Sequence, residues 1–466
     1  MDRREFLAVA AAIPAMAGSQ KRLDGTRGVS GHSSNDEICF MDAAELARLI
    51  KSRAISAAEV MQACLAQIDR VNSKVNAICT LVERDQLLRQ ARAADERPGK
   101  SRTLGPLHGF PHAVKDLVPT AGIRTTYGSP IFQDHVPEKS AEAVVRLEAA
   151  GYADVGKANL HEFAFGMTSE NPHYGTVPNP IAPDRIAGGS SGGSAAALAA
   201  GMADAALGSD TAGSIRCPSA FCGTVGLRPT FGLVPVDGCF PLSPSFDTVG
   251  PMARTVSECA DMMAALAPEM DPVPTISPGD VEVGLAWVGE ADPLIRARVE
   301  ETAAIFPNCR DIPLPALPPG IRDVRMRETA ETHAKLFSEY RDRYGHDVAA
   351  KLDRCMEVTD REYEAGLETR ERYRDRFAEL MRGIDVVLTP TQPIVAPPVG
   401  IGDLKLRGQL TKFTYPFSAI GAPALAVPCG EAEDGLPASI QVIGRPGMDA
   451  LVLGVGALLE SHSSPG

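Results

Sequence analysis

The sequence of 466 residues has few aromatic side chains, no closely spaced cysteine pairs and no excess of positive charge. Aromatic residues make up only 5%, but 44% of the residues are hydrophobic and 23% are charged, which is typical of a globular protein. The formal net charge of −13 disfavours nucleic acid and anionic membranes as partners, because both repel an acidic surface. After the N-terminal region no stretch reaches the roughly 18 apolar residues of a membrane-spanning helix, so we expect no stable membrane anchor.

The ten cysteines are scattered without a C-x-x-C pair, which argues against a structural zinc site and favours buried free thiols over assignable disulfides. His161-Glu162 could begin a zinc-protease motif, but Phe165 stands where the second histidine is required. His108 and His112 are four residues apart, yet Pro111 prevents the helix that would align them. We therefore expect neither a metal nor a cofactor.

The first residues have the layout of an export signal. Arg3 and Arg4 precede an apolar, alanine-rich run that ends in the small-x-small pattern Ala15-Met-Ala17. Paired arginines are typical of twin-arginine export, so residues 1–17 predict a periplasmic or secreted protein. The alternative is a short amphipathic helix on a cytoplasmic protein. Residues 18–37 are expected to form a flexible lead, and residues 38–460 the main domain.

The pattern along the chain indicates an α/β protein. Residues 41–76 have helical spacing, broken into two pieces near Ser52 and Ser56. From 104 to about 267, short apolar runs alternate with turns and alanine-rich helical runs, which predicts a sheet with helical crossovers. Residues 322–382 are charged and predict two or three surface helices, a cap-like insert, after which Asp385, Ala424 and Ser439 begin strand-like runs.

A glycine-rich loop, Gly188-Gly-Ser-Ser-Gly-Gly-Ser194, leads into the helical run Ala195–Ala200. Glycine is favoured where the backbone adopts positive φ or comes close to a ligand. Such a loop can also bind phosphate at a helix N-terminus, but this one neither ends in Gly-Lys-Ser/Thr nor contains G-x-G-x-x-G. The loop therefore indicates an active site or a structural turn, with phosphate binding as the alternative.

A second turn of small residues, Leu207-Gly-Ser-Asp-Thr-Ala-Gly-Ser-Ile-Arg216, places Ser214 directly after a glycine. Such a turn can expose a hydroxyl while several backbone N–H groups point inward, as stabilisation of an oxyanion requires. A serine hydroxyl needs a base to become a good nucleophile. Lys115, which ends the run His112-Ala-Val-Lys115, can be that base if burial lowers its pKa from about 10.4. The alternative is an ordinary exposed lysine.

In this order and spacing these segments resemble the amidase signature family, over about residues 41–450. The resemblance implies a single α/β domain with a large central mixed β-sheet covered by helices on both faces. It also rests on Gly156-Lys-Ala-Asn-Leu-His-Glu-Phe-Ala164, Ser169-Glu-Asn-Pro-His-Tyr-Gly175, Phe221-Cys-Gly-Thr-Val-Gly-Leu-Arg-Pro-Thr230, Asp247-Thr-Val-Gly-Pro251 and Gly435-Leu-Pro-Ala-Ser-Ile-Gln-Val-Ile-Gly444.

The resemblance also implies roles for single residues. Ser214 would be the nucleophile, Ser190 the bridging serine after a cis peptide bond, and Lys115 the base. Ser191 would support the network by hydrogen bonding, and Asp210 and Arg216 would pair to fix the turn. The oxyanion hole would be formed by the backbone N–H groups of Thr211, Ala212, Gly213 and Ser214. An apolar acyl pocket would be lined by Ala164, Phe165, Gly166 and Met167. Residues 322–382 and Lys405–Phe417 would shape the rest of the substrate site.

One residue departs from the family pattern: Ala212 stands where many members have glycine. A left-handed backbone at an alanine costs on the order of 1 kcal/mol, so we expect a narrower space beside the oxyanion hole rather than loss of activity.

The implied reaction is hydrolysis of a small-molecule carboxylic amide. Neutral Lys115 would take a proton through Ser190 from Ser214, whose oxygen attacks the carbonyl before water releases the acyl group. Two other functions compete: the A-type subunit of a glutamine-dependent amidotransferase that supplies ammonia to a partner, and a degenerate member that only binds. A cysteine nucleophile is disfavoured, because Cys217 and Cys222 lack an activating context. We expect a monomer or a homodimer.

Overall fold

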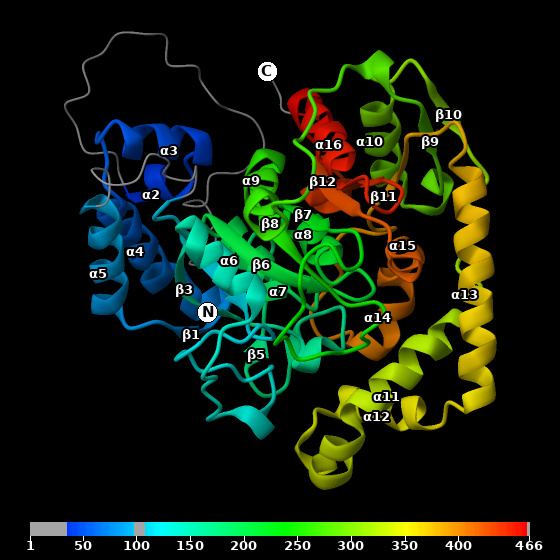
Figure 1. Cartoon of the computed structure of the whole chain (residues 1–466), viewed down its shortest axis with the longest axis horizontal. Coiled ribbons are helices and arrows are strands. Elements are labelled where there is room, and N and C mark those ends of the chain that lie inside the picture. The colour runs from blue at the N-terminus through cyan, green and yellow to red at the C-terminus, as the bar shows by residue number, and fades with distance from the viewer. Residues whose placement is uncertain (1–34, 97–107, 464–466) are drawn as a thin grey trace.

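The computed structural model describes residues 35–96 and 108–463 and shows one central β-sheet surrounded by helices (Figure 1). The predicted export signal over residues 1–17 and most of the predicted lead over 18–37 lie outside the described residues. The sheet has 11 strands, in the order β1-β3-β2-β6-β8-β7-β12-β13-β11-β9-β10. They are β1 (Ile78–Leu81), β2 (Pro111–Lys115), β3 (Ala153–Ala158), β6 (Ala205–Asp210), β7 (Val225–Arg228), β8 (Thr248–Ala253), β9 (Val283–Leu285), β10 (Cys309–Asp311), β11 (Val386–Pro390), β12 (Ala424–Glu431) and β13 (Pro437–Ile443); β4 (Glu170–Asn171) and β5 (Gly175–Thr176) form a separate pair.

The sheet is mixed, as predicted. β2 runs parallel to both of its neighbours, β3 and β6, whereas β6, β8, β7, β12, β13 and β11 follow one another in antiparallel pairs. Because parallel strands end at the same edge of a sheet, the carboxyl ends of β2 and β6 lie side by side. The last residue of β2 is Lys115 and the last of β6 is Asp210. The predicted base and the predicted serine turn therefore begin at one edge.

Helices cover both faces of the sheet. Successive side chains of a strand point to opposite faces of the sheet. Accordingly, Ala113 of β2 and Ala206 of β6 belong to one hydrophobic cluster, and the residues that follow them, Val114 and Leu207, belong to another. The first cluster includes residues of α4, α5 and α7, and the second includes residues of α6, α9, α10 and α16. The helices are α2 (Asn35–Cys39), α3 (Ala43–Lys51), α4 (Ala57–Val75), α5 (Arg84–Glu96), α6 (Glu142–Ala150), α7 (Gly192–Ala199), α8 (Arg216–Cys222), α9 (Val256–Leu266), α10 (Pro293–Ala303), α11 (Ile321–Tyr340), α12 (His346–Met356), α13 (Asp360–Leu380), α14 (Asp403–Leu410), α15 (Tyr415–Ile420) and α16 (Asp449–Ser463).

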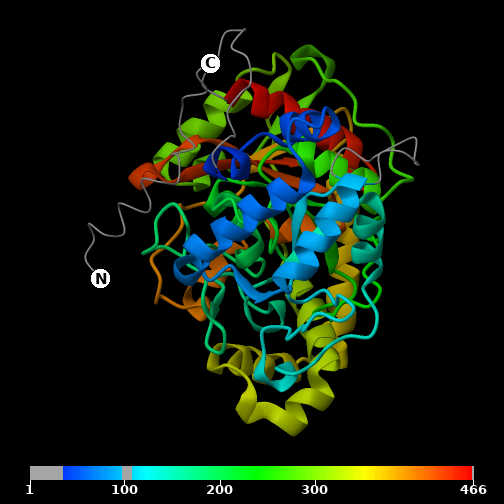
Figure 2. The same ribbon diagram turned by 90° about the vertical axis from the view of Figure 1, so that its left-hand side faces the viewer.

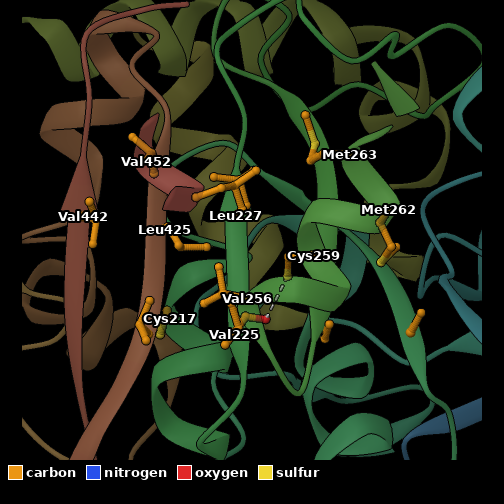
Figure 3. Close-up of a cluster of buried hydrophobic side chains, with 14 of the residues drawn as sticks. Cys217, Val225, Leu227, Val256, Cys259, Met262, Met263, Leu425, Val442 and Val452 are labelled. Carbon is orange, nitrogen blue, oxygen red and sulfur yellow. Dashed lines mark hydrogen bonds between the residues drawn. The ribbon is translucent and has the colours of Figure 1, made fainter. Parts of the chain in front are cut away.

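The core between the sheet and α9 and α16 is built from aliphatic and sulfur-containing side chains. Val256, Cys259, Met262 and Met263 of α9 and Val452 of α16 lie over side chains of β7, β12 and β13 (Figure 3). All ten cysteines lie in the described part of the chain, and none is in a disulfide. The prediction of free, mostly buried thiols therefore fits the structure.

Local sequence signals explain where the helices begin and end. The predicted break near Ser52 and Ser56 separates α3 from α4, and Ser56 forms a reciprocal capping box with Glu59 at the start of α4. α4 ends where Asn76 adopts a left-handed conformation, which asparagine tolerates better than most residues. Within the described ranges, no helix combines the length and apolarity needed to cross a bilayer.

The charged segment after β10 forms α11, α12 and α13. In Figure 1, α11 and α12 extend away from the sheet at the lower right, and α13 runs along the right-hand side; this segment also forms the bottom of Figure 2. Both α12 and α13 pack against α11, and α13 also reaches α15. α13 begins with a capping box between Thr359 and Glu362. One side of α11 is buried although it carries polar residues, among them Arg325 and Glu328.

Candidate active site

The predicted base lies against the predicted bridging serine. Lys115 Nζ donates hydrogen bonds to Ser190 Oγ at 2.6 Å and to Ser209 Oγ at 2.9 Å. The peptide bond between Gly189 and Ser190 is cis, as the family resemblance implied. Lys115 and Ser190 are fully buried, at 0% exposure.

Ser214 lies in the turn between β6 and α8, next to the glycine-rich loop. Its backbone C=O accepts a hydrogen bond from the Ser191 N–H at 3.1 Å, and its side chain is 3% exposed. Ser214 Oγ lies 3.9 Å from Met167 Sδ, which is a weak contact. No hydrogen bond joins the hydroxyls of Ser214 and Ser190 among the described residues, so that part of the relay stays a prediction. In free enzymes such contacts are often long and tighten only when substrate binds.

The buried position of Lys115 changes its protonation. Burial lowers the pKa of Lys115 to about 7, and the carboxylates of Asp210 and Asp247 oppose this only in part. A lysine with such a pKa is neutral in a substantial fraction of molecules near neutral pH. The Lys115 amine can therefore accept a proton, which the exposed-lysine alternative would not allow.

The backbone N–H groups of the glycine-rich loop are already used within the protein. Gly193 N–H donates to the Asn159 C=O at 2.9 Å, and Gly192 N–H donates to Ser169 Oγ at 3.2 Å. The Ser191 N–H also donates, to the Ser214 C=O. These contacts leave few backbone N–H groups free to bind an anion at the start of α7. The geometry therefore disfavours the phosphate-binding alternative for this loop.

A buried ion pair fixes the serine turn. The Asp210 carboxylate receives two hydrogen bonds from Arg216, both 3.0 Å long, and the two side chains are 0% exposed. The same carboxylate accepts the backbone N–H of Gly213 at 2.8 Å and that of Ile215 at 3.3 Å. The predicted pair of Asp210 and Arg216 thus holds the turn through both side-chain and backbone contacts.

The predicted oxyanion donors are not all available. Because the Gly213 N–H is occupied by Asp210, Gly213 departs from the predicted role, whereas no acceptor within the described residues takes the N–H of Thr211, Ala212 or Ser214. Positive φ falls on Gly213, at 127°, and a Cβ there would lie 2.2 Å from Thr414 Oγ1. The strain considered for Ala212 does not arise, because Ala212 is not among the residues with positive φ.

Residues 164–167, the predicted acyl pocket, form a buried loop beside Ser214. Met167 N–H donates to Asp403 Oδ1 of α14 at 2.6 Å, and Lys351 Nζ of α12 donates to the Phe165 C=O. Lys351 also pairs with Asp403 Oδ2 at 2.7 Å, so the two helices and the loop are joined by one ionic network. Phe165 and Met167 are 2% and 3% exposed.

The group His161, Asp347 and Asp403 has donor atoms close enough to surround a metal ion. However, the Lys351 ammonium lies 2.9 Å from Asp347 Oδ2 and 2.7 Å from Asp403 Oδ2. His161 Nε2 is 2.8 Å from the same Asp347 oxygen. The positive charge that these carboxylates require is supplied by the lysine, which would repel a divalent cation. The residues do not fit a metal site.

Comparison with known proteins identifies the family of the chain. The Amidase family model matches residues 59–286 and 318–453. The chain belongs to the amidase family. It is 34% identical, over 92% of its length and 97% of the relative's, to the A-type subunit of the glutamyl-tRNA(Gln) amidotransferase of Anaeromyxobacter sp. (strain K). The crystal structure of an amidase matches with a TM-score of 0.82 and 34% identity, covering 91% of this chain and all of the other. A 6-aminohexanoate cyclic dimer hydrolase with bound substrate matches with a TM-score of 0.78 and 27% identity, covering 92% and 98%.

The structure adds residues to the candidate site to which sequence reasoning assigned no role. Arg228 donates to both the backbone and the carboxylate oxygens of Asp210, and Asp247 accepts a hydrogen bond from Thr211 Oγ1 at 2.6 Å. Ser209 shares the Lys115 ammonium with Ser190. All three lie inside segments that carried the family resemblance, which is the signal that could have pointed to them.

Neither cysteine close to the serine turn, Cys217 or Cys222, is an activated nucleophile. Burial raises the pKa of Cys217 to about 12 and raises that of Cys222 as well. A thiol is reactive as the thiolate, which these pKa values disfavour at neutral pH. The structure therefore leaves the two serines as the candidate hydroxyl nucleophiles.

Replacing Asp210 with asparagine should strongly destabilise this protein. Burial by itself raises the pKa of Asp210, but Arg216 and Arg228 outweigh that effect and hold the pKa well below its ordinary value. Removal of the carboxylate charge leaves two buried guanidinium groups without their counter-ion, which costs about 3–5 kcal/mol. Urea unfolding curves of the variant and the wild type measure the loss.

Asp353→Asn is the matched control for that substitution. Asp353 pairs with Arg341 at 2.6 Å, but the two side chains are 46% and 53% exposed. An exposed pair contributes about 0–1 kcal/mol, so this variant should unfold almost like the wild type. Equally small losses in both variants would contradict the importance of the buried pair.

Proposed function

We propose that this protein hydrolyses the C–N bond of small-molecule carboxylic amides through an acyl-enzyme on Ser214. The observation that supports this proposal best is the 2.6 Å hydrogen bond from Lys115 Nζ to Ser190 Oγ. At this buried position desolvation holds the pKa of Lys115 at about 7. A neutral amine in contact with a serine hydroxyl can begin the proton transfer that a serine nucleophile needs.

In the proposed mechanism, Ser214 Oγ attacks the amide carbon while its proton passes through Ser190 to Lys115. The negative charge on the carbonyl oxygen is stabilised by the free N–H groups of Thr211, Ala212 and Ser214, and one well-placed donor contributes about 3–4 kcal/mol. The relay then returns the proton to the leaving nitrogen. Water attacks the ester on Ser214, and the same groups assist in reverse order.

A second candidate function is that of the A-type component of a glutamine-dependent amidotransferase. It is favoured by the Anaeromyxobacter relative of that kind, which aligns with 92% of this chain at 34% identity. In that function the same residues would release ammonia from glutamine for a partner protein. Export through the predicted signal over residues 1–17 would separate the chain from a cytoplasmic partner, and therefore favours the self-contained hydrolase.

The two functions differ in substrate and in their need for a partner. Ammonia release should be measured for the full-length chain alone with a panel of aliphatic, aryl and peptide C-terminal amides, and with glutamine. We expect turnover of simple amides without any added protein. The second candidate would be supported instead if glutamine were the only substrate that releases ammonia and if this release required added amidotransferase partner proteins. A folded protein that releases ammonia under neither condition would contradict both.

A further inference from the structure

Arg325 carries a buried charge without a counter-ion. It lies on α11, is 7% exposed, and its Nε has no hydrogen-bond partner among the residues that the structure describes. Two other buried arginines of the described chain have clear partners: Arg254 pairs with Asp204 at 2.9 Å, and Arg370 donates to Ser245 and Ala419. No described carboxylate forms an ion pair with Arg325. A buried charge is normally paired, because leaving one unpaired is costly.

The guanidinium of Arg325 lies between two aromatic side chains that flank the serine turn. Its Cζ is 5.5 Å from the centre of the Phe165 ring and 5.7 Å from that of Tyr415. Phe165 belongs to the loop whose Met167 contacts Ser214 Oγ. Tyr415 follows Thr414, which donates a hydrogen bond to the Ala212 C=O at 2.6 Å. Arg325 therefore lies beside the expected acyl pocket and is tied to the nucleophile's turn through both of its aromatic neighbours.

The surroundings of the Phe165 ring have a surplus of positive charge. Lys351 Nζ lies 4.9 Å from the ring centre and Arg407 Cζ lies 5.1 Å from it, distances similar to the 5.5 Å of Arg325 Cζ. Asp403 and Asp347 are the carboxylates of this network. Both are already paired with Lys351, and Asp403 also lies 4.0 Å from the Arg407 guanidinium.

The remaining acidic group close by is Glu328, one turn after Arg325 on α11. It accepts hydrogen bonds from Ser243 Oγ and Ser245 Oγ, each 2.6 Å long. It is thus engaged by these hydroxyls and leaves Arg325 unmatched. Such a concentration of cations is notable in a chain whose net charge is −13, and it points to an anionic ligand.

We propose that Arg325 binds a carboxylate of the substrate, so that the preferred substrates are monoamides of dicarboxylic acids. This inference rests on the proposed function. The amide carbon would lie at Ser214, a short methylene chain would contact Phe165 and Met167, and the distal carboxylate would receive the Arg325 guanidinium. Residues 164–167 would then contact the apolar middle of the substrate, and the end of the substrate farthest from the amide would carry the charge. Arginine suits this role, because its planar donors match a carboxylate.

Paired substrates of equal length test the assignment. Values of kcat/KM should be compared for glutaramate and adipamate and for the uncharged pentanamide and hexanamide. We expect the wild type to prefer the charged member of each pair. Arg325→Met should lower kcat/KM for the monoamides about 10- to 100-fold, the size of a lost hydrogen bond to a charged group, and change the neutral amides less than about threefold. Arg325→Lys should keep part of the preference.

Arg322→Gln is the matched control, since Arg322 is an exposed arginine on the same helix. The control removes the same charge and should keep the preference for monoamides. Because Arg325→Met removes an unpaired buried charge, its thermal midpoint should not fall, which separates loss of binding from loss of folding. An equal decrease for charged and neutral amides, or no preference in the wild type, would overturn the inference.

A binding measurement separates this inference from the proposed function. Calorimetric titration with glutarate requires no turnover; it should show binding to the wild type and at least about tenfold weaker binding to Arg325→Met. Absence of turnover with all four amides would contradict the proposed hydrolase, but it would not affect the conclusion drawn from glutarate binding. Glutarate affinity that is unchanged in Arg325→Met would overturn the role of Arg325.

Discussion

Ser214→Ala should lower kcat for the best amide substrate on the order of 10⁶-fold, since loss of a serine nucleophile removes the covalent route altogether. The residual rate would come from substrate binding and the N–H groups of the turn. The measurement is ammonia release by a highly concentrated preparation of the variant. The fold should be retained, because within the described residues the one hydrogen-bond contact of Ser214 Oγ is the weak one with Met167 Sδ, at 3.9 Å.

Ser219→Ala is a matched control for this substitution. Ser219 is buried on α8, five positions beyond the proposed nucleophile, and no group in the described part of the chain forms a hydrogen bond with its hydroxyl. Removing an unsatisfied hydroxyl is nearly neutral, so this variant should turn over like the wild type. If Ser214→Ala kept a rate within tenfold of the control, Ser214 would not be the nucleophile.

Lys115→Met should lower kcat/KM about 10²- to 10⁴-fold, the usual contribution of a general base. The wild-type kcat/KM should rise with pH through about 7, because Lys115 works only after it loses its proton and burial places its pKa there. The variant should lose this rise. Methionine has a similar length and no charge, so the buried space stays filled.

The matched control is Lys157→Met, which replaces a second fully buried lysine. Lys157 Nζ donates to the Val118 C=O and to Thr120 Oγ1, away from the serines. We expect this variant, once its folding is verified by circular dichroism, to keep the rise of kcat/KM with pH. An unchanged pH profile in Lys115→Met would show that another group titrates.

The sequence was informative where the site depends on local backbone. Ser190 and Ser214 could be found because glycine-rich turns beside alanine-rich or apolar runs are uncommon, and the order of these segments points to one family. The strands that begin near residues 386, 424 and 437 were anticipated from short apolar runs. Helical spacing, broken near Ser52 and Ser56, likewise predicted α3 and α4 as separate helices.

The sequence was uninformative where contacts join distant segments. Charged side chains at helical spacing normally face solvent, so residues 322–382 predicted surface helices. Yet Arg325, Glu328 and Lys351 are all buried. Glu328 and Lys351 are paired with groups far away in the chain, and Arg325 lies between two aromatic rings. No periodicity could show this. Nor could it show that the Asp210 carboxylate takes the Gly213 N–H and removes one of the predicted oxyanion donors.

The ionic network that joins α12, α14 and the loop at residues 164–167 holds the predicted substrate pocket independently of the predicted reacting groups. The groups proposed to break the bond are anchored in the sheet around Asp210, whereas the loop beside them is held by Lys351 and Asp403, which lie far along the sequence. If the loop at residues 164–167 lines the acyl pocket, as predicted, mutations in the later helices should change substrate preference while Ser190 and Ser214 keep their positions. Divergence of substrate preference within such a scaffold should accordingly concentrate in α11, α12 and α14.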